Sequence, residues 1–597
     1  MKETIRQRIA SLREFMKKRE LSAFIIPSTD PHSGEYVPER WKSREWISGF
    51  NGSAGTMVIT LDKAGLWTDS RYWLAADEML ADTGIDLFKD RIPETPSIPV
   101  WLASVLPAGA VVGVDGEVNS ITAVEDWRLQ LQDNGLKLNT DYDPMAQLWK
   151  DRPDIPAAQA FILPVKYAGE SVEDKLSRMR AAIAAHHAQG MLVTMLDEIA
   201  WLLNLRGDDV EYNPVFVSYL LLTDEDVTLF IRPQKLTAEV RDYLAACGVK
   251  VRGYEEVYDA LTAYPKSSIL MQADRCNYKA YSCMGKQCRV VRAESPILYA
   301  KAIKNEVEIA GFRRVMESEG VAFVKFLYWL KQAVKEEKET EFSIDEKLTA
   351  FRAQDPMFRG LSFATIAGYK DHAAVVHYEA TRESAYTLHP SGMLLLDCGG
   401  QYWDGTTDVT RTIVLGPLSQ EEKEDYTRVL KGFIDLSRAI FPKGTYGTQL
   451  DAFARMPLWE AGINYLNGTG HGVGHYLNVH EGPHQFRMNY MPAPLLPGMN
   501  ITNEPGIYKG GRHGVRTENT TLVVRDRETE FGEFYRFEQL TLCPIDKEAI
   551  VPQLLGKQDI EWLNRYHERV YARLNGHLNS IYRDFLAAAC APLEVVE

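Results

Sequence analysis

The sequence predicts an α+β protein of three domains, in which two similar α/β domains precede a larger unit of mixed helices and strands. Three observations lead to this prediction. The chain has 597 residues, and single hydrophobic cores stop growing at roughly 250–300 residues. The first half contains a weak internal repeat. The second half begins with a long helical pattern and carries two acidic turns, which we interpret as hairpins.

The first domain is expected at 1–155. An amphipathic helical pattern opens the chain and is followed by the strand SAFIIPST. The alternating segment TMVITLDKAGLWTDSRYW then turns between Asp62 and Gly65. The segment 143–158, DPMAQLWKDRPDIPAA, has three prolines and little periodicity. It is therefore a candidate linker.

A second α/β domain is expected at 156–300, where GMLVTML, SYLLL and TLFI are the candidate strands. Trp46 and Trp201 each begin a segment of Trp, five residues and Gly, namely WISGFNG and WLLNLRG. Each segment follows one candidate strand and precedes another. This repeat indicates two similar domains rather than one large one.

The third domain is expected at 301–597. Apolar residues recur at helical spacing from near Lys301 and predict a long helix. These residues are Ile309, Phe312, Val315, Phe323, Phe326 and Leu330. From about 550 we expect a helical extension, with one amphipathic helix over 559–589 that docks on the body or on a second subunit. Its apolar stripe consists of Leu563, Val570, Leu574, Leu578, Ile581 and Phe585.

Composition excludes several classes of function. A formal charge of −15 argues against non-specific binding to nucleic acid or to an acidic membrane. The sequence has no uninterrupted apolar stretch of about 18 residues, so we expect no membrane span. The start, MKETIRQRIASLREFM, lacks the apolar core of a signal peptide. Seven scattered cysteines without a CxxC spacing favour a reduced, cytoplasmic setting.

Two acidic pairs, each straddling a tight turn, carry the main functional signal. Asp397 and Asp408 flank the turn in LLLDCGGQYWDGTTDVTRTIV, and Glu504 and Glu518 flank the turn in ITNEPGIYKGGRHGVRTENTTLVV. If the first turn centres between residues 402 and 403 and the second on Gly511, the members of each pair face each other across two strands. Directly opposed Cβ atoms lie about 4.5–5.5 Å apart, where like charges are destabilising. Two such pairs of carboxylates therefore predict a bound cation that offsets their repulsion.

A histidine-rich segment, YLNGTGHGVGHYLNVHEGPH, lies between the two acidic turns. One of its histidines and the four carboxylates make an oxygen-rich set of five ligands, two of which could bridge. Such a set suits two divalent cations about 3.5–4 Å apart. It favours Mn²⁺, Co²⁺ or Fe²⁺ over a structural zinc, which prefers sulphur and nitrogen ligands.

The motifs DCGGQYWDGTTDVTRT, GTGHGVG, VHEGP, NEPGIY and RTEN resemble those of the pita-bread dinuclear metallopeptidases. The best match is to their cytosolic aminopeptidase P type, which removes an N-terminal residue preceding proline. FNGSAGT, LWTDSRY and the three-domain length fit that subgroup, and the resemblance spans nearly the whole chain. It implies a C-terminal pita-bread (creatinase/aminopeptidase) catalytic domain after two creatinase-N-like α/β domains.

The resemblance also implies the roles of the five ligands. Asp397 chelates the first metal, and His471 and Glu504 bind the second. Asp408 and Glu518 bridge the two. Mn²⁺ is the expected ion, with Co²⁺, Fe²⁺ or Zn²⁺ as alternatives.

The resemblance places three further residues at the substrate, and a fourth residue, Arg516, is expected beside a metal ligand. His377 and His480 face the substrate and steady the tetrahedral intermediate, although either could be a structural histidine if the family is disregarded. Arg71 contacts substrate; its alternative is a surface charge on a hairpin. Arg516 shares a strand face with Glu518 and could hydrogen-bond a metal-bound carboxylate.

The implied reaction is attack of a metal-bridging hydroxide on the carbonyl of an X–Pro bond, with Glu504 as the proton shuttle and with the free α-amine near Asp397. His475 is expected to be structural or to support a ligand, and His484 to be a loop residue. The preference for proline follows from the resemblance alone. The C-terminal helix suggests a homodimer.

Other functions remain to be weighed. A prolidase would use the same five ligands on X–Pro dipeptides, and the residues do not exclude it. A non-catalytic peptide-binding or chaperone module of this fold, or a creatinase-like amidinohydrolase, would lack the metal ligands. All five expected positions are present in this chain, which argues against both.

Overall fold

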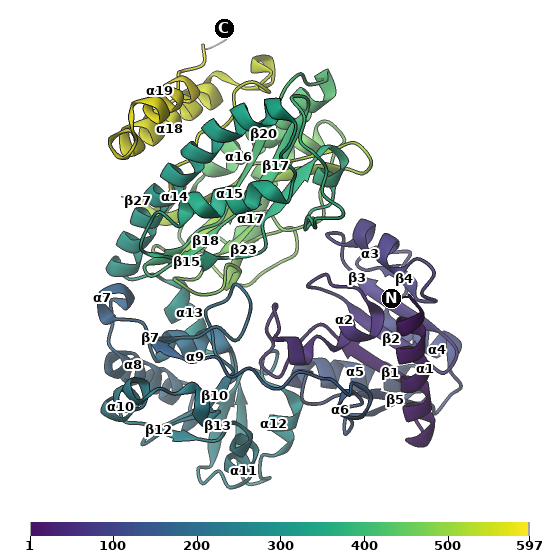
Figure 1. Cartoon of the computed structure of the whole chain (residues 1–597). Helices are drawn as coiled ribbons and strands as arrows, with labels where there is room; N and C mark the ends of the chain where they lie inside the picture. Colours follow the sequence, from purple (N-terminus) through teal and green to yellow (C-terminus); the bar gives the residue numbers. More distant parts are fainter. Residues whose placement is uncertain (1, 595–597) are drawn as a thin grey trace. The chain divides into compact units, whose positions relative to one another are not determined.

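The computed structural model describes residues 2–594 and forms two compact units (Figure 1). Unit 1 consists of the chain up to Leu163 together with Glu170–Leu298. Unit 2 consists of Pro164–Gly169 and the chain from Tyr299 onward. The predicted boundary near 155 lies inside unit 1, in a segment without helix or strand over 152–160.

Unit 1 contains two six-stranded sheets with the same arrangement. The first is built from β1 (Ala23–Pro27), β2 (Thr56–Thr60), β3 (Ala64–Thr68), β4 (Asp86–Lys89), β5 (Val111–Val114) and β6 (Lys137–Asn139). The second is built from β8 (Gly190–Val193), β10 (Ser218–Thr223), β11 (Val227–Ile231), β12 (Val249–Arg252), β13 (Ser268–Met271) and β14 (Arg289–Arg292). Their orders are β4-β3-β2-β1-β5-β6 and β12-β11-β10-β8-β13-β14.

The two sheets of unit 1 also agree in strand direction. The first strand of each, β1 or β8, pairs antiparallel with one neighbour and parallel with the other. Trp46 lies on α2 (Ser43–Ser48) and Trp201 on α9 (Leu196–Leu202), the helices that follow these first strands. The prediction of two similar α/β domains is therefore confirmed, and the repeated tryptophan marks equivalent helices.

Helices cover the sheets of unit 1, and β7 (Phe161–Ile162) pairs with β9 (Leu205–Arg206) beside them. The remaining helices around the first sheet are α1 (Lys2–Lys18), α3 (Trp73–Leu80), α4 (Ile98–Val105), α5 (Ile121–Asp133) and α6 (Met145–Leu148). Those around the second are α8 (Val172–Ala185), α10 (Ala238–Ala246), α11 (Val257–Thr262) and α12 (Tyr278–Ser282), and α13 (Pro296–Ala302) contains the boundary between the two units.

Unit 2 begins with the short α7 (Val165–Ala168) and the predicted long helix, α14 (Glu306–Ala333). The Asn305 side chain caps α14 by accepting hydrogen bonds from the amides of Val307 and Glu308, groups that the helix itself leaves unpaired. Five of the six predicted apolar residues of α14 are buried, and Ile309 is partly buried.

Several small sheets and helices complete unit 2. The sheets have the orders β16-β17-β20, β15-β18-β19 and β21-β28-β27-β24, with the pairs β22-β23 and β25-β26. Their strands are β15 (Phe358–Leu361), β16 (Ile366–Tyr369), β17 (Met393–Cys398), β18 (Gly400–Tyr402), β19 (Gly405–Thr406), β20 (Val409–Val414), β21 (Ile440–Pro442), β22 (Gly470–Gly472), β23 (Glu481–Phe486), β24 (Asn500–Asn503), β25 (Gly506–Lys509), β26 (His513–Arg516), β27 (Asn519–Thr529) and β28 (Gly532–Gln539). The helices are α15 (Ser343–Arg352), α16 (Gln420–Ser437), α17 (Gly447–Trp459), α18 (Lys557–Leu574) and α19 (Ser580–Ala589).

The C-terminal tail forms two helices, α18 and α19, where the sequence predicted one. Asn579 starts the second helix by capping the amide of Tyr582. Both helices pack against α14 (Figure 1). Most of the predicted apolar stripe is buried there, whereas Ile581 stays 56% exposed. The tail therefore docks on the body of unit 2.

The register of the two acidic hairpins is the feature that positions the site. In the second hairpin Asn503 pairs with Asn519 and Gly506 with Arg516, which centres the turn on Gly511 as predicted. In the first hairpin Asp397 pairs with Thr410. The predicted direct pairing of Asp397 with Asp408 is therefore wrong by two residues. Asp408 shares the face of Thr410 and is a diagonal neighbour of Asp397.

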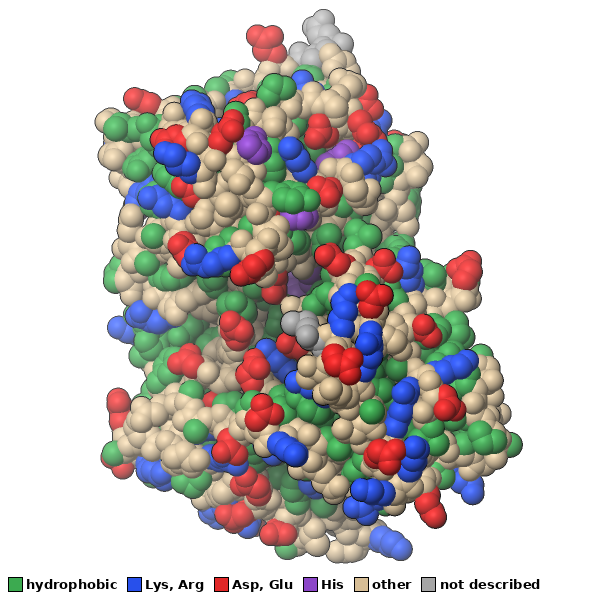
Figure 2. Space-filling model, turned by 45° about the vertical axis from the view of Figure 1, so that its right-hand side comes forward, with side chains coloured by type: hydrophobic (Ala, Val, Ile, Leu, Met, Phe, Trp, Pro, Cys, Tyr) green, Lys and Arg blue, Asp and Glu red, His purple; other side chains and the backbone are tan. Residues whose placement is uncertain are grey.

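Over residues 2–594, none of the helices is long and apolar enough to cross a membrane. On the face drawn in Figure 2, basic and acidic side chains are interspersed. All seven cysteines are free thiols.

Candidate metal centre

Three of the predicted ligands converge closely in unit 2. Asp408, His471 and Glu518 each offer a ligand atom, and these atoms lie within 4.8 Å of one another. His471 Nε2 also lies 3.3 Å from Glu504 Oε1 and 3.5 Å from Asp408 Oδ2. Four of the five predicted ligands thus surround one small volume.

Backbone contacts orient His471 for coordination. Its Nδ1 lies 2.9 Å from the carbonyl oxygen of Gly472. A nitrogen that donates to a carbonyl carries the proton, so the lone pair is on Nε2. That lone pair faces the carboxylates of Asp408 and Glu504. Such an arrangement is repulsive by itself and becomes favourable when a cation lies between the groups.

Asp397, the fifth predicted ligand, lies beside Arg516. The guanidinium donates from Nη2 to Asp397 Oδ2 at 2.6 Å and from Nη1 to the Tyr508 hydroxyl at 2.8 Å. Arg516 thus holds one oxygen of Asp397. The other oxygen, Oδ1, is buried and has no hydrogen-bond partner among the described residues.

Buried, unsatisfied oxygens are the direct sign that a cation fits here. Glu518 Oε2 accepts a hydrogen bond of 2.7 Å from Thr410, but Oε1 is buried without a partner within residues 2–594. A buried acceptor left in this state is costly. Together with Asp397 Oδ1, it provides carboxylate oxygens for a hard divalent cation. The residues present therefore fit the predicted metals.

Electrostatics leads to the same conclusion. Burial, followed by the charges of Asp397 and Glu504, raises the pKa of Asp408 well above its ordinary value. Burial and the charge of Asp408 do the same to the pKa of Glu518. Burial also acts on Glu504, but the neighbouring His471 and the charge of Arg516 outweigh it and lower its pKa. These carboxylates need positive charge to stay ionised together.

The two histidines predicted to face the substrate lie on different segments. The ring of His480 lies 4.3 Å from that of His471, centroid to centroid, in an edge-to-face arrangement. His377 lies after β16, in a segment that returns toward that strand. Glu379 forms a bridge with Ile366, and Ile366 pairs with Asp397. The backbone therefore brings the segment of His377 beside the strand that carries Asp397.

Arg71 belongs to unit 1, where its partners are local. Its guanidinium donates to both carboxylate oxygens of Asp69, at 3.0 and 2.9 Å, and lies 3.8 Å from Glu35 Oε1. The Arg71 side chain is 23% exposed. It is thus a partly buried, ion-paired group, and its contact with substrate stays a prediction.

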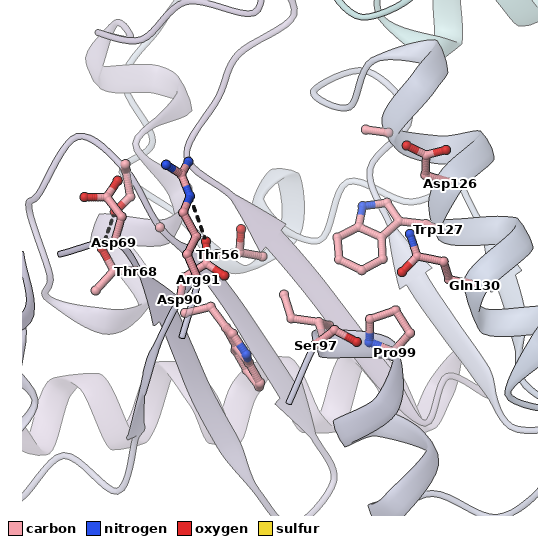
Figure 3. Close-up of a pocket in the computed structure, with 15 residues that line it drawn as sticks. Thr56, Thr68, Asp69, Asp90, Arg91, Ser97, Pro99, Asp126, Trp127 and Gln130 are labelled. Carbon is pink, nitrogen blue, oxygen red and sulfur yellow. Dashed lines mark hydrogen bonds and ion pairs between the residues drawn. The ribbon is translucent and has the colours of Figure 1, made fainter. Parts of the chain in front are cut away.

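Unit 1 also contains a cavity of about 430 Å³, which opens between strand ends and helices (Figure 3). Trp127 and Gln130 of α5 form one side, and Thr68 and Asp69 lie on the other. None of the five predicted metal ligands lines this cavity. Those five residues all belong to unit 2.

The remaining histidines of the motif have structural surroundings. His475 is 2% exposed and its ring lies 5.7 Å from that of Phe312 on α14. His484 is fully buried on β23, so the prediction of a loop residue is wrong. Its Nε2 lies 2.6 Å from the Asn500 carbonyl oxygen, and burial lowers its pKa to about 4. A buried strand position explains its neutral ring.

Several residues that support the site were missed by sequence reasoning. Thr410 donates to Glu518, and Thr502 Oγ1 lies 3.2 Å from Glu504 Oε1. Each threonine is two residues from a predicted ligand, so strand alternation could have indicated both. Arg411 donates to the carbonyl oxygens of Thr410 and Glu518. Arg411 thereby links the two hairpins by hydrogen bonds, a contact that the sequence pattern does not predict.

Family models match most of the chain. The Creatinase/Prolidase N-terminal domain matches twice, at 8–141 and at 151–308. Metallopeptidase family M24 matches residues 310–525, and the C-terminal region of the M24 peptidases matches 533–593.

Curated relatives match along nearly their full lengths. The chain is 39% identical to a probable Xaa-Pro aminopeptidase P of Laccaria bicolor, over 98% of this chain and 93% of the relative. It is also 39% identical to Xaa-Pro aminopeptidase 1 of Dictyostelium discoideum, over 95% and 93%. It is 37% identical to aminopeptidase P1 of Arabidopsis thaliana, over 98% and 99%.

Solved structures share the fold. The X-prolyl aminopeptidase of Caenorhabditis elegans, described as a cytosolic enzyme with a di-nuclear active site, superposes with a TM-score of 0.94 at 32% identity. The match covers 99% of this chain and 100% of the other. The Xaa-Pro dipeptidase of Bacillus anthracis matches 63% of this chain and 99% of its own, with a TM-score of 0.51 at 22% identity, which shows a shared fold alone.

Proposed function

The chain belongs to metallopeptidase family M24, and from that premise we propose that it is an aminopeptidase that hydrolyses the N-terminal X–Pro bond of peptides with two divalent metals. The observation that carries this proposal is the clustering of Asp408, His471 and Glu518. Glu504 and a half-satisfied Asp397 lie next to this cluster.

The aminopeptidase is favoured over the prolidase by the extent of the similarity. The relatives that match this chain over nearly its whole length are named Xaa-Pro aminopeptidases. The dipeptidase structure resembles about two thirds of the chain and shows the fold alone. Retention of all five predicted ligands also separates this chain from a non-catalytic binding module.

The chain's own residues account for binding and proton handling. When bound, the two metals lower the pKa of water and polarise the scissile carbonyl. Asp397 would hold one metal and His471 with Glu504 the other, with Asp408 and Glu518 shared between them. Glu504 would carry the proton from water to the leaving nitrogen. His377 and His480 would donate to the oxygen that becomes negative.

Two finer features belong to the proposal. Mn²⁺ is the expected metal because carboxylate oxygens dominate the ligand set, with Co²⁺, Fe²⁺ and Zn²⁺ as alternatives. We expect a cytoplasmic location, as described for the Caenorhabditis elegans enzyme. We also propose domain boundaries near 155 and 300, which the extents of the matched regions support.

We further propose that the enzyme is a homodimer and that α17 supplies the contact. Phe453, Met456 and Trp459 recur every three residues and are 44%, 47% and 46% exposed. Residues at this spacing share one helix face. An exposed apolar helix face is a candidate interaction surface, which supports this proposal.

A combined metal and substrate experiment tests the function. The purified protein would be analysed for bound metals, then stripped with a chelator and reloaded with Mn²⁺, Co²⁺, Zn²⁺ or Fe²⁺. Each form would be offered Gly-Pro, Arg-Pro-Pro and longer peptides with proline at the second position. We expect two metals per chain and release of the first residue from tripeptides and longer peptides.

The same experiment separates the alternatives. N-acetylation of the peptide should abolish cleavage, since an aminopeptidase reads the free α-amine. Turnover of Gly-Pro alone would identify a prolidase. A protein that binds Arg-Pro-Pro without hydrolysing it in any metal form would be a binding module, and the proposed activity would be wrong.

A further inference from the structure

Glu341 is a buried carboxylate that gathers donors from four residues. It precedes α15 and is 1% exposed. Its Oε1 accepts a hydrogen bond of 2.6 Å from the Tyr369 amide, and its Oε2 one of 2.7 Å from the Tyr386 amide. His372 Nδ1 and the Tyr378 hydroxyl lie 2.9 and 3.2 Å from Oε2. Charged acceptors form the stronger hydrogen bonds in proteins, so this is a firm anchor.

The four partners of Glu341 all belong to one segment, residues 369–386. Tyr369 and Tyr386 are its two ends, and one carboxylate holds both. The ring of His372 stacks on that of Tyr386, with 3.6 Å between centroids and 12° between planes. Tyr378 is the residue directly after His377. Glu341 therefore closes the segment 369–386 into a loop and fixes the residue adjacent to His377.

The other side of this loop contacts the strands of the metal centre. Arg516, which holds Asp397, also reaches the Val376 carbonyl oxygen, with 3.4 Å between Nη2 and oxygen. A side chain on Gly514 would place its Cβ 1.8 Å from the Ala373 carbonyl oxygen. This close approach of two backbones leaves the loop little room to shift toward β26. The loop is thus held between Glu341 and the Asp397 strand.

We propose that Glu341 is a positioning residue for His377. It holds the loop 369–386 so that the His377 side chain is presented to the substrate at the metal centre. The inference rests on the proposed function, because the contact of His377 with substrate is part of it. Glu341 would act through His377 and would have no contact with the metals.

A carboxylate is required at this position by the number and kind of its partners. Both oxygens of Glu341 accept backbone N–H groups, from Tyr369 and from Tyr386. A glutamine has one acceptor oxygen, and its NH₂ group would face an N–H donor. The Glu341→Gln substitution would therefore release one end of the loop while keeping the volume of the side chain.

The first test is the kinetics of Glu341→Gln on Arg-Pro-Pro in the Mn²⁺ form. We expect kcat to fall about 10- to 100-fold, the range for residues that orient catalytic groups. KM should change by less than about threefold, since the affected contact is strongest in the transition state. The bound metal content should equal that of the wild type.

The second test is a double-mutant cycle with His377→Ala. If Glu341 acts through His377, adding Glu341→Gln to His377→Ala should cause no further loss of kcat beyond about twofold. A further tenfold loss in the double variant would show that Glu341 acts by another route and would overturn the proposal.

Asp559→Asn is the matched control. Asp559 is a 2% exposed carboxylate that binds Arg438 at 2.7 Å, Lys431 at 3.1 Å and the Gly556 amide at 2.8 Å. It lies on α18 and has no contact with the loop. The control should lower the unfolding temperature and leave kcat within about twofold of the wild type.

Amide hydrogen exchange tests the anchoring of the loop without any substrate. Peptides covering 369–386 should exchange faster in Glu341→Gln than in the wild type, and should be unchanged in Asp559→Asn. Unchanged exchange in Glu341→Gln would overturn the proposal, whatever the kinetics. If the wild type cleaved no X–Pro peptide but this loop still loosened, the proposed function would fail and the anchoring by Glu341 would stand.

Discussion

The single residue that best explains the site is Asp408, because several repulsive interactions act on its carboxylate at once. Its carboxylate faces His471 Nε2 at 3.5 Å, and burial, followed by the charges of Asp397 and Glu504, raises its pKa. Without metal its ionised form is destabilised by these surroundings, and with metal it is a ligand. Asp408 should therefore destabilise the metal-free protein and stabilise the metal-bound protein.

We predict that Asp408→Asn abolishes activity but does not unfold the protein. Loss of the shared ligand should lower kcat/KM by about a thousandfold or more. In EDTA the variant should unfold at a higher temperature than the wild type, because one buried repulsion is removed. Mn²⁺ should raise the unfolding temperature of the wild type and hardly change that of the variant.

Asp404→Asn is the control for this experiment. Asp404 lies in the turn of the same hairpin and pairs with Arg314 at 2.6 Å, away from the ligand set. It should keep both the Mn²⁺ response and the activity. Substantial Mn²⁺-dependent turnover in Asp408→Asn would contradict the bridging role.

His480 gives a second prediction at this scale. Its ring lies beside His471, where it could donate to the developing oxyanion. His480→Ala should lower kcat about 100- to 1000-fold, the usual loss on removing one such donor, with KM nearly unchanged. The half-buried His389, which lies 3.1 Å from Glu337, provides the control variant His389→Ala, which should keep the kcat of the wild type. An unchanged kcat with raised KM would instead make His480 a plain binding residue.

Among the elements, the two hairpins show what sequence alone predicts about a site. Both turns were recognised from their residues, and Gly511, with φ of +70°, is the predicted centre of the second. The first turn was misplaced by one residue, which shifted the pairing of Asp397 by two. Symmetry of two acids about a turn does not determine register, because backbone hydrogen bonds determine it. Since a shift of two keeps the face, Asp397 and Asp408 still lie on one face of the sheet, and their role as ligands stays a prediction.

The C-terminal helix α18 carries a prediction about pH. His567 is fully buried, and its Nε2 accepts a hydrogen bond of 3.0 Å from the Ile545 amide. Burial, with the charges of Lys547 and Arg411, lowers its pKa to about 3. In the unfolded chain the pKa is about 6.5. The unfolded state therefore binds the proton first, and stability is lost as the pH falls from about 6.5 toward 3.

We predict that His567→Gln flattens this part of the pH profile. Glutamine keeps an acceptor for the Ile545 amide but does not titrate. Between pH 7 and pH 4.5 the wild type should lose about 2–3 kcal/mol more unfolding free energy than the variant. Urea unfolding in EDTA at both pH values measures this difference. Parallel pH profiles for the two proteins would rule out His567 as the titrating group.

At the scale of the whole molecule, the sequence predicted the two similar domains but did not predict the surface on which the C-terminal helices pack. The repeated tryptophan segments of unit 1 correspond to equivalent helices because the same sheet arrangement occurs twice. The apolar stripe of the tail showed only that one face is buried, and did not show against what. The structure places that face on α14, so the tail no longer argues for a dimer. An exposed apolar face remains on α17 instead.

We therefore predict that Trp459→Glu converts a dimer into a monomer. A glutamate in the middle of an apolar contact is desolvated without a partner, which costs several kcal/mol on each side of a symmetric interface. Light scattering of the wild type should give about twice the mass of one chain, 67.6 kDa, and the variant about that mass. Ile581→Glu, at the exposed position of α19, is the matched control and should stay dimeric. A monomeric wild type would refute the homodimer, and dissociation by Ile581→Glu alone would move the interface to the C-terminal helices.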